Sequence, residues 1–174
     1  MKKISFVLAL LGVCCFAPAL NAQTAAGACP STKTIDELVS ALDAAVSGPA
    51  DKDRTCFRRV FTEDAQLVPL AKGPDGSLVP RTLTVDGWIA AVKKHGSEVF
   101  YEKQIKYTSD VYGHMAQIWS TYETRSTPDG KALDRGINSI EAVKDGQEWK
   151  AEHILWEAER PGETVPEQYL PAQK

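Results

Sequence analysis

The sequence predicts an α+β domain in which helices pack on one face of a curved antiparallel sheet. Helical periodicity and helix caps occur before residue 97, whereas four long runs rich in aromatic and β-branched residues follow residue 99. Helices followed by an antiparallel meander are typical of this class, because each layer buries its apolar face against the other. We assign this single domain to residues 34–160.

The first 22 residues have the three parts of a secretory signal peptide. Lys2 and Lys3 are basic, residues 4–17 are apolar, and the small residues before position 23 offer a cleavage site after Ala22. An uncleaved membrane anchor is the alternative, but the apolar run is short for a spanning helix, which needs about 20 such residues. We therefore expect a periplasmic or secreted protein with no membrane attachment after cleavage.

The four cysteines fall into two pairs. Cys14 and Cys15 lie inside the apolar run, where the preceding residues fit a lipidation site poorly, so we expect both to be removed with the signal. Cys29 and Cys56 remain, and an isolated pair in an oxidising compartment usually forms a disulfide. Neither a CxxC motif nor zinc-ligand spacing accompanies them. The sequence predicts a structural disulfide and no metal site, with residues 23–33 as a flexible tail.

Charge and motifs argue against several classes of function. The formal net charge is −3, and no basic run with interleaved aromatic residues is present, so nucleic acid is not an expected partner. The sequence also has no nucleophile elbow, phosphate loop, dinucleotide fingerprint or zinc spacing. We therefore expect no cofactor, and either ligand binding or cofactor-free chemistry.

The first helix has clear start and stop signals. Thr34 and Glu37 form a capping box, in which the hydroxyl and the carboxylate satisfy free N–H groups at a helix start. Apolar residues then recur at spacings of three and four as far as Val46, which predicts one stripe facing a core. Gly48-Pro49 ends this helix, and residues 53–61 are expected to form a second one.

A hairpin and a third helix are expected next. Residues 61–70 and 77–83 are extended segments on either side of a Gly-Pro-Asp-Gly turn. Thr84 or Asp86 caps the third helix, which stops at His95-Gly96.

The second half of the chain is expected to form four consecutive antiparallel strands. The turns between them carry Tyr-Gly, Pro-Asp-Gly and Asp-Gly, which are residues typical of hairpin turns. Three prolines in PGETVPEQYLP make residues 161–174 an extended or disordered tail. The expected strands are residues 101–113, 114–126, 132–143 and 148–159.

The order of elements, together with IWSTYETR, RGINSIEAV and DGQEWKAEHILWE, resembles the nuclear-transport-factor-2-like superfamily in its SnoaL-like branch of exported bacterial proteins. The resemblance covers residues 34–159. It implies a cone-shaped half-barrel of curved sheet closed by helices around one apolar cavity, often as a homodimer packed through the sheet. Members include ketosteroid isomerase, polyketide cyclases, dehydratases, epoxide hydrolases and non-catalytic binding modules, so the fold alone does not decide the function.

Strand alternation divides the side chains of the last two strands between two faces. We expect a bulge to exchange strand partners without changing the alternation within a strand. The expected concave, helix-covered face collects Asn138, Ile140, Ala142, Trp149, Ala151, His153 and Leu155. The expected outer face, solvated near the turn and suited to a dimer further away, collects Ile137, Ser139, Glu141, Lys150, Glu152, Ile154 and Trp156.

His153 is the sharpest candidate for proton chemistry on the concave face, and it needs a carboxylate partner. Glu123 would supply one if it shares the inward facing expected for Trp119. Alternatively, His153 is a neutral hydrogen-bonded histidine in the cavity wall, and Glu123 forms a salt bridge with Arg125 or Arg135 at the rim.

Several further side chains are candidates for the site. In ketosteroid isomerases the base is an aspartate on the first strand after the helices, and Asp64 lies near such a place, although it could equally cap a turn. Asn138 could orient a ligand carbonyl or satisfy the backbone of a bent sheet. Trp88 and Trp119 are candidate ligand platforms that occur more often in a core, and Tyr122 could donate to an oxyanion.

These observations favour an exported protein that binds a small apolar or amphipathic molecule in the cone cavity. A second hypothesis is a cofactor-free isomerase, cyclase or hydrolase that uses His153 with Glu123 or Asp64. A third is a scaffold that recruits a protein partner through the open sheet. We also expect a homodimer that packs through the sheet.

Overall fold

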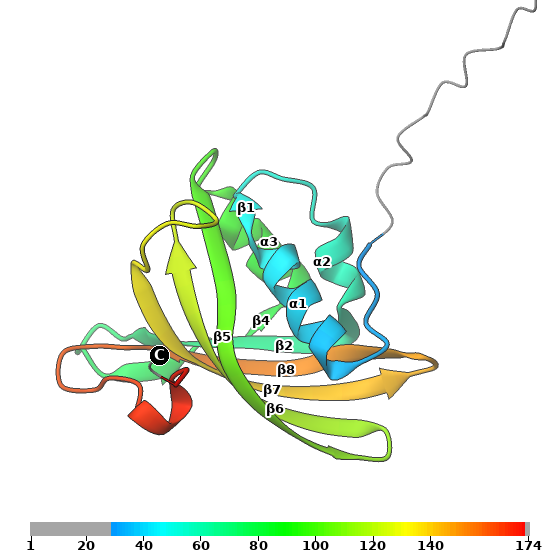
Figure 1. Ribbon diagram of the computed structural model, residues 1–174. Coiled ribbons are helices and arrows are strands. Elements are labelled where there is room, and N and C mark those ends of the chain that lie inside the picture. Colours follow the sequence, from blue (N-terminus) through cyan, green and yellow to red (C-terminus); the bar gives the residue numbers. More distant parts are fainter. Residues whose placement is uncertain (1–28, 173–174) are drawn as a thin grey trace, which may run out of the picture.

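The computed structural model describes residues 29–172, which form three helices and a curled sheet (Figure 1). The helices are α1 (Ile35–Val46), α2 (Thr55–Arg59) and α3 (Val85–Lys93), and a 3-10 turn spans Glu167–Tyr169. The strands are β1 (Gly48–Pro49), β2 (Phe61–Lys72), β3 (Leu78–Pro80), β4 (Leu83–Thr84), β5 (Val99–Tyr112), β6 (Met115–Arg125), β7 (Asp134–Asp145) and β8 (Glu148–Ala158).

The helix starts follow the cap chemistry in the sequence. The Thr34 hydroxyl accepts the Glu37 N–H at 3.1 Å and the Glu37 carboxylate accepts the Thr34 N–H at 3.3 Å, which confirms the capping box. Thr84, rather than Asp86, caps α3 by accepting the Gly87 N–H at 3.0 Å. These bonds satisfy N–H groups that have no partner inside a helix.

The sheet has the order β1-β5-β6-β7-β8-β2-β3, with β4 also paired to β2. The predicted hairpin of β2 and β3 is confirmed, as is the meander from β5 to β8. The expectation of a wholly antiparallel sheet is wrong at one place, since β2 runs parallel to β8. The three helices cover the concave side of this curl, and the α+β half-barrel prediction is confirmed (Figure 1).

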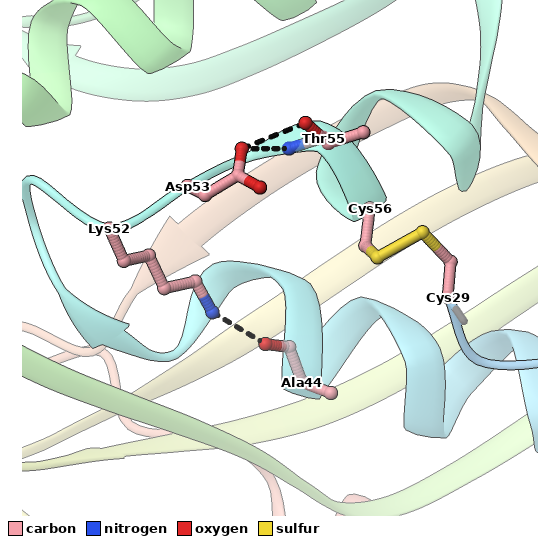
Figure 2. Close-up of a disulfide and its surroundings, with 6 residues drawn as sticks. All are labelled: Cys29, Ala44, Lys52, Asp53, Thr55 and Cys56. Atoms are coloured by element: carbon pink, nitrogen blue, oxygen red, sulfur yellow. Dashed lines mark hydrogen bonds between the residues drawn. A yellow bond between two sulfur atoms is a disulfide. The ribbon is translucent and has the colours of Figure 1, made fainter. Parts of the chain in front are cut away.

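A disulfide joins the start of the described chain to α2. The bond links Cys29 to Cys56, as predicted, across a sequence separation of 27 (Figure 2). The same corner holds the carboxyl end of α1, where the Lys52 ammonium donates to the Ala44 carbonyl at 2.9 Å and Arg54 donates to the carbonyls of Ala45, Val46 and Pro49. Cations suit the carbonyl end of a helix, because the free carbonyls there carry partial negative charge.

Side-chain hydrogen bonds also fix the start of α2, close to the disulfide. Asp53 accepts from both the backbone N–H and the hydroxyl of Thr55, at 3.0 and 2.8 Å, which fixes the first turn of α2 (Figure 2). The helix is shorter than the expected 53–61, because the chain enters β2 at Phe61.

Residues 29–33, which were expected to be flexible, are packed against the domain. Thr32 is buried, and its carbonyl accepts the Trp149 N–H at 2.7 Å.

Two bulges change which residues of a strand face the helices. In β8, Ala151 pairs with Ala142 but His153 pairs with Glu141, so Glu152 is an extra residue. The expectation that a bulge preserves alternation is therefore wrong. Ile154 and Trp156 face the helices, while His153 and Leu155 face outward. A bulge at Ile105 shifts β5 against β6 in the same way.

The C-terminal segment, residues 161–172, lies on the opposite side of the sheet from the helices (Figure 1). The Tyr169 carbonyl accepts from the Thr121 hydroxyl at 2.7 Å, and the Tyr169 ring contacts Trp119 with the ring centroids 5.9 Å apart. The Lys106 ammonium donates to two further carbonyls of the segment. The segment is thus packed rather than free, and it covers part of the face on which a homodimer was expected. The homodimer stays a prediction.

The predicted signal peptide, residues 1–22, lies outside the described residues, as do Cys14 and Cys15. Among the helices between residues 29 and 172, none has the length and apolar character needed to cross a membrane.

Candidate functional site

A cavity of about 130 Å³ lies between the helices and the concave face of the sheet. Its walls are mainly apolar and rich in aromatic rings, and its polar side chains come from β5 and β7. The apolar lining comprises Leu42, Val46, Phe57, Phe61, Leu67, Trp88, Phe100, Ile140, Ile154 and Trp156. The polar lining comprises Glu102, Gln104 and Asn138.

The polar side chains form one hydrogen-bonded network. Gln104 Nε2 donates to Glu102 Oε1 at 2.9 Å. Asn138 Nδ2 lies 3.3 Å from Glu102 Oε1 and 3.4 Å from Gln104 Oε1. The hydroxyl of Ser120, which is fully buried on β6, donates to Gln104 Oε1. Three neighbouring strands therefore contribute side chains to the network around the Glu102 carboxyl group.

Strand geometry explains why these side chains converge. Phe100, Glu102 and Gln104 alternate along β5 before the bulge at Ile105 and so share the concave face. Pairing then brings neighbouring strands into line, with Ser120 of β6 opposite Asn138 of β7. The Ser47 hydroxyl accepts the Glu102 N–H at 2.9 Å, which ties this part of β5 to the end of α1.

A second carboxyl group lies beside the network. Asp43 on α1 accepts the Gln104 N–H at 2.9 Å, while its other oxygen, Oδ1, is buried without a hydrogen-bond partner. Burial raises the pKa of Asp43 to about 6. Burial, and then the nearby charge of Asp43, raise the pKa of Glu102 to about 7. Both shifts follow from the cost of ionising carboxyl groups away from water and close to each other.

Tyr122 lies on the concave side of β6 but behind the network rather than in the cavity wall. It is buried, and its pKa is raised by burial and by the nearby Glu102 carboxyl. The ring fits against Gly136 of β7, where an added Cβ would lie 2.5 Å from the Tyr122 hydroxyl oxygen and 2.6 Å from Cζ. Gly136 therefore makes room for Tyr122.

An outer chamber of about 410 Å³ adjoins the cavity and shares Val46, Trp88 and Phe100 with it. Trp88 is fixed between two neighbours. Phe57 stacks on it with ring centroids 4.4 Å apart, and the Arg54 guanidinium lies 5.4 Å from its ring centroid. Phe100 is 38% exposed, so the shared wall is reached from solvent through the outer chamber.

The structure separates the residues that were expected to act together. His153 faces outward, paired with Glu141 on one side and Gln66 on the other. Glu123 also faces outward and binds Arg125 at 2.5 Å and Arg135 at 2.8 Å, so its predicted alternative as a salt bridge is confirmed. These arginines lower the pKa of the Glu123 carboxyl against the opposing effect of burial, which is the largest single influence on it.

The remaining candidates divide between the two faces. Asp64 is exposed in an irregular part of β2, away from the cavity lining. Trp119 lies on the outer face under the C-terminal segment. Trp88 and Asn138 do line the cavity. The inward facing expected for Trp119 is therefore wrong, and the condition set for Glu123 is not met, because even-numbered residues of β6 such as Ile118 and Ser120 face the core.

Glu102, Gln104 and Asp43 were missed by the sequence interpretation. A signal for the first two was present, since they alternate along the strand with Phe100, an aromatic residue that lines the same cavity. Asp43 follows Leu42 at the edge of the apolar stripe of α1, which is a position where a solvated aspartate is also common. Only the packing of α1 on β5 distinguishes a buried aspartate at this position from a solvated one.

The arrangement places an ionisable carboxyl group at the polar end of an apolar cavity. Such a group can accept a hydrogen bond from a ligand or exchange a proton with it near neutral pH. Within residues 29–172, no three His, Cys, Asp or Glu side chains are grouped so as to hold a metal ion.

Comparison with protein-family models finds no matching family, and comparison with curated proteins finds no relative. Solved structures match in three dimensions. A protein from Kribbella flavida has a TM-score of 0.55 at 18% identity, covering 72% of this chain and 88% of that one. An NTF2-like protein of unknown function from Pseudomonas putida KT2440 has a TM-score of 0.53 at 13% identity, covering 70% and 82%.

A candidate aromatic ring hydroxylase from Novosphingobium aromaticivorans has a TM-score of 0.54 at 21% identity, covering 71% of this chain and 85% of that one. Identities this low show a shared fold and leave the chemistry open. The curled sheet, the helices on its concave side and these structural matches agree with one another. The chain therefore has the nuclear-transport-factor-2-like fold.

Proposed function

We propose that this protein binds a compact small molecule with an apolar body in the cavity between the helices and the sheet. The observation that carries the proposal is the hydrogen-bonded Glu102 carboxyl group at one end of this largely apolar cavity. Burying a carboxyl group costs free energy unless it is well partnered. Cavities that stay empty are typically lined by apolar groups alone, whereas polar lining groups need a bound partner. Ligand sites, in contrast, combine apolar walls with a few converging polar groups.

We also propose that the protein acts outside the cytoplasm, in the periplasm or after secretion. Residues 1–22 have the pattern of a signal peptide. The Cys29–Cys56 disulfide supports the same compartment, since such bonds persist in oxidising surroundings.

A second candidate function is a cofactor-free isomerase, cyclase or hydrolase in which Glu102, in place of His153, exchanges the proton. One observation favours it. With a pKa raised to about 7, Glu102 is present in both protonation states near neutral pH, as a general acid or base requires. The mechanism would also need a substrate atom within hydrogen-bond reach of Glu102.

Native mass spectrometry of the protein purified from its own source tests the binding function. We expect a retained small molecule in the wild type, weaker retention in Glu102→Gln, and wild-type retention in Glu123→Gln. The control makes the same chemical change on the outer face, where Glu123 has no part in the cavity. Equal retention by both variants, or no bound molecule in any of the three proteins, would contradict the proposal.

A further inference from the structure

The polar end of the cavity offers hydrogen-bond acceptors and few donors. Asn138 Nδ2 carries two protons, and it faces two acceptors, Glu102 Oε1 and Gln104 Oε1. Ser120 gives its single hydroxyl proton to Gln104 Oε1, and Gln104 Nε2 donates to Glu102 Oε1. The two amide groups are oriented by these contacts, because turning either one would bring acceptors together. The donor protons of these side chains are therefore engaged within the protein, apart from the second proton of Gln104 Nε2.

Two acceptor atoms of the lining are left without a donor. Among residues 29–172, nothing donates a hydrogen bond to Glu102 Oε2 or to Asn138 Oδ1, although both side chains line the cavity. Neither atom is among the fully buried side-chain atoms that lack a partner, so water in the cavity can reach both. A ligand that displaces this water leaves each acceptor unpaired, at a cost in free energy, unless it supplies a donor. A ligand that supplies donors would satisfy both atoms.

The charges at the site also disfavour an anionic ligand. No Lys, Arg or His is among the residues that line the cavity, whereas Glu102 lines it and Asp43 lies behind it. Arg54 lines the outer chamber, but the two terminal nitrogens of its guanidinium donate to backbone carbonyls. An anionic ligand would meet two carboxyl groups with no counter-charge, and this would select strongly against it.

The size and walls of the cavity limit the body of the ligand. A volume of about 130 Å³ is close to that of apolar cavities that hold one benzene ring, about 150 Å³. Aromatic side chains supply several of the walls, and they favour a flat apolar body. These side chains are Phe57, Phe61, Trp88, Phe100 and Trp156.

We propose that the ligand is a ring-sized apolar molecule that presents an amine or hydroxyl donor to Glu102 and Asn138, and that the site rejects carboxylates. This inference rests on the proposed binding function and names the class of ligand for the same site.

Three probes with one ring and different polar groups test this class: benzylamine, benzyl alcohol and benzoate. We expect isothermal titration calorimetry of the full chain at pH 8 to give the tightest binding for benzylamine. Benzoate should bind about tenfold more weakly or worse, because it lacks the charged hydrogen bond that benzylamine makes. Between pH 6 and pH 8, benzylamine affinity should rise, because Glu102 ionises while the amine stays protonated. Benzyl alcohol affinity should change little.

The matched variants assign the preference to one side chain. Glu102→Gln keeps the shape of the site and removes its charge, so we expect about tenfold weaker benzylamine binding and loss of its pH dependence. Glu123→Gln should bind all three probes as the wild type does. Benzoate binding as tight as benzylamine binding would overturn the donor proposal and leave the binding function intact. Failure of all three probes would overturn the ring-sized class, while native mass spectrometry decides separately whether the cavity binds a ligand.

Discussion

Glu102 and Glu123 show how the two faces of one sheet give the same residue opposite properties. The two glutamates lie on paired strands one residue out of register, since Glu102 pairs with Thr124 and Lys103 with Glu123. Glu102 meets neutral amides and a second carboxyl group, and its pKa is raised to about 7. Glu123 meets two arginines, and its pKa is lowered. The facing of a carboxyl group, more than its place in the sequence, therefore decides its chemistry.

Removing the disulfide should have the largest effect on the free energy of unfolding. The bond belongs to the helical side of the sheet and not to the outer face. Closing a loop with a sequence separation of 27 constrains the unfolded chain. We expect Cys29→Ser with Cys56→Ser to lower the free energy of unfolding by about 3–4 kcal/mol. Urea denaturation under oxidising conditions measures it. A loss that vanishes when both proteins are reduced identifies the disulfide as the cause, and a loss that persists would show another origin.

Gly136→Ala should have the next largest effect, since it removes the space that keeps Tyr122 on the concave side. The new Cβ would press on the Tyr122 hydroxyl and even more closely on the Glu157 carbonyl. We expect a loss of about 1–3 kcal/mol in the free energy of unfolding, as for other overpacked sites. Adding Tyr122→Phe should restore part of this loss by deleting the hydroxyl. An unchanged midpoint in urea for Gly136→Ala would contradict the close fit.

The pH dependence of stability should have opposite signs for the two glutamates. Because the pKa of Glu102 is raised, the contribution of this group to the free energy of unfolding is complete below about pH 4.5 and is lost as the pH rises through about 7. The lowered pKa of Glu123 means that its contribution is present above pH 4.5 and is lost in acid. From pH 4 to pH 8, the wild type should lose up to about 3 kcal/mol relative to Glu102→Gln.

The same titration of Glu123→Gln supplies the comparison. The wild type should gain about 1 kcal/mol relative to this variant as the pH rises from strongly acidic values to about 5. Urea denaturation at each pH gives both differences. Parallel profiles for the two variants would show that the faces do not impose opposite environments.

His153→Ala should have the smallest effect. The imidazole lies on the outer face beside Glu141 and Gln66, so the substitution is expected to change the free energy of unfolding by less than about 0.5 kcal/mol. Retention of a bound molecule in native mass spectrometry should equal that of the wild type. Weaker retention would mean that His153 reaches the ligand in solution, and the assigned faces of β8 would need revision.

The parts of the fold that depend on local chemistry were predictable from the sequence. Thr34 and Thr84 cap helices through bonds to residues three positions away, and Gly146 adopts a positive φ of 64° in a turn placed within one residue of its expected position. Such contacts involve neighbours in the chain. Composition and spacing are therefore enough to predict these caps and turns.

The candidate site was not predictable in the same way. Asn138 on β7 was placed correctly, but the other strand residues of the site lie on or beside strands whose facing is reset by bulges at Ile105 and Glu152. Neither bulge position carries Gly or another bulge signal. One extra residue moved His153 out of the cavity and Trp156 into it. The role of Asp43 depends on a contact with Gln104 across a sequence separation of 61. Long-range packing of this kind leaves no local pattern.

The parallel pairing of β2 with β8 has a consequence for the order in which the molecule can fold. Thr62 on β2 donates to Glu152 on β8 across a sequence separation of 90, so the wall between these strands forms only after nearly the whole domain has been synthesised. The chain entropy lost in closing such a loop is recovered late, and domains dominated by distant pairings fold slowly as a rule. Until β8 docks, the apolar edge of β2 is exposed to other chains. The time spent in that state, more than the stability of the finished domain, would set its tendency to aggregate.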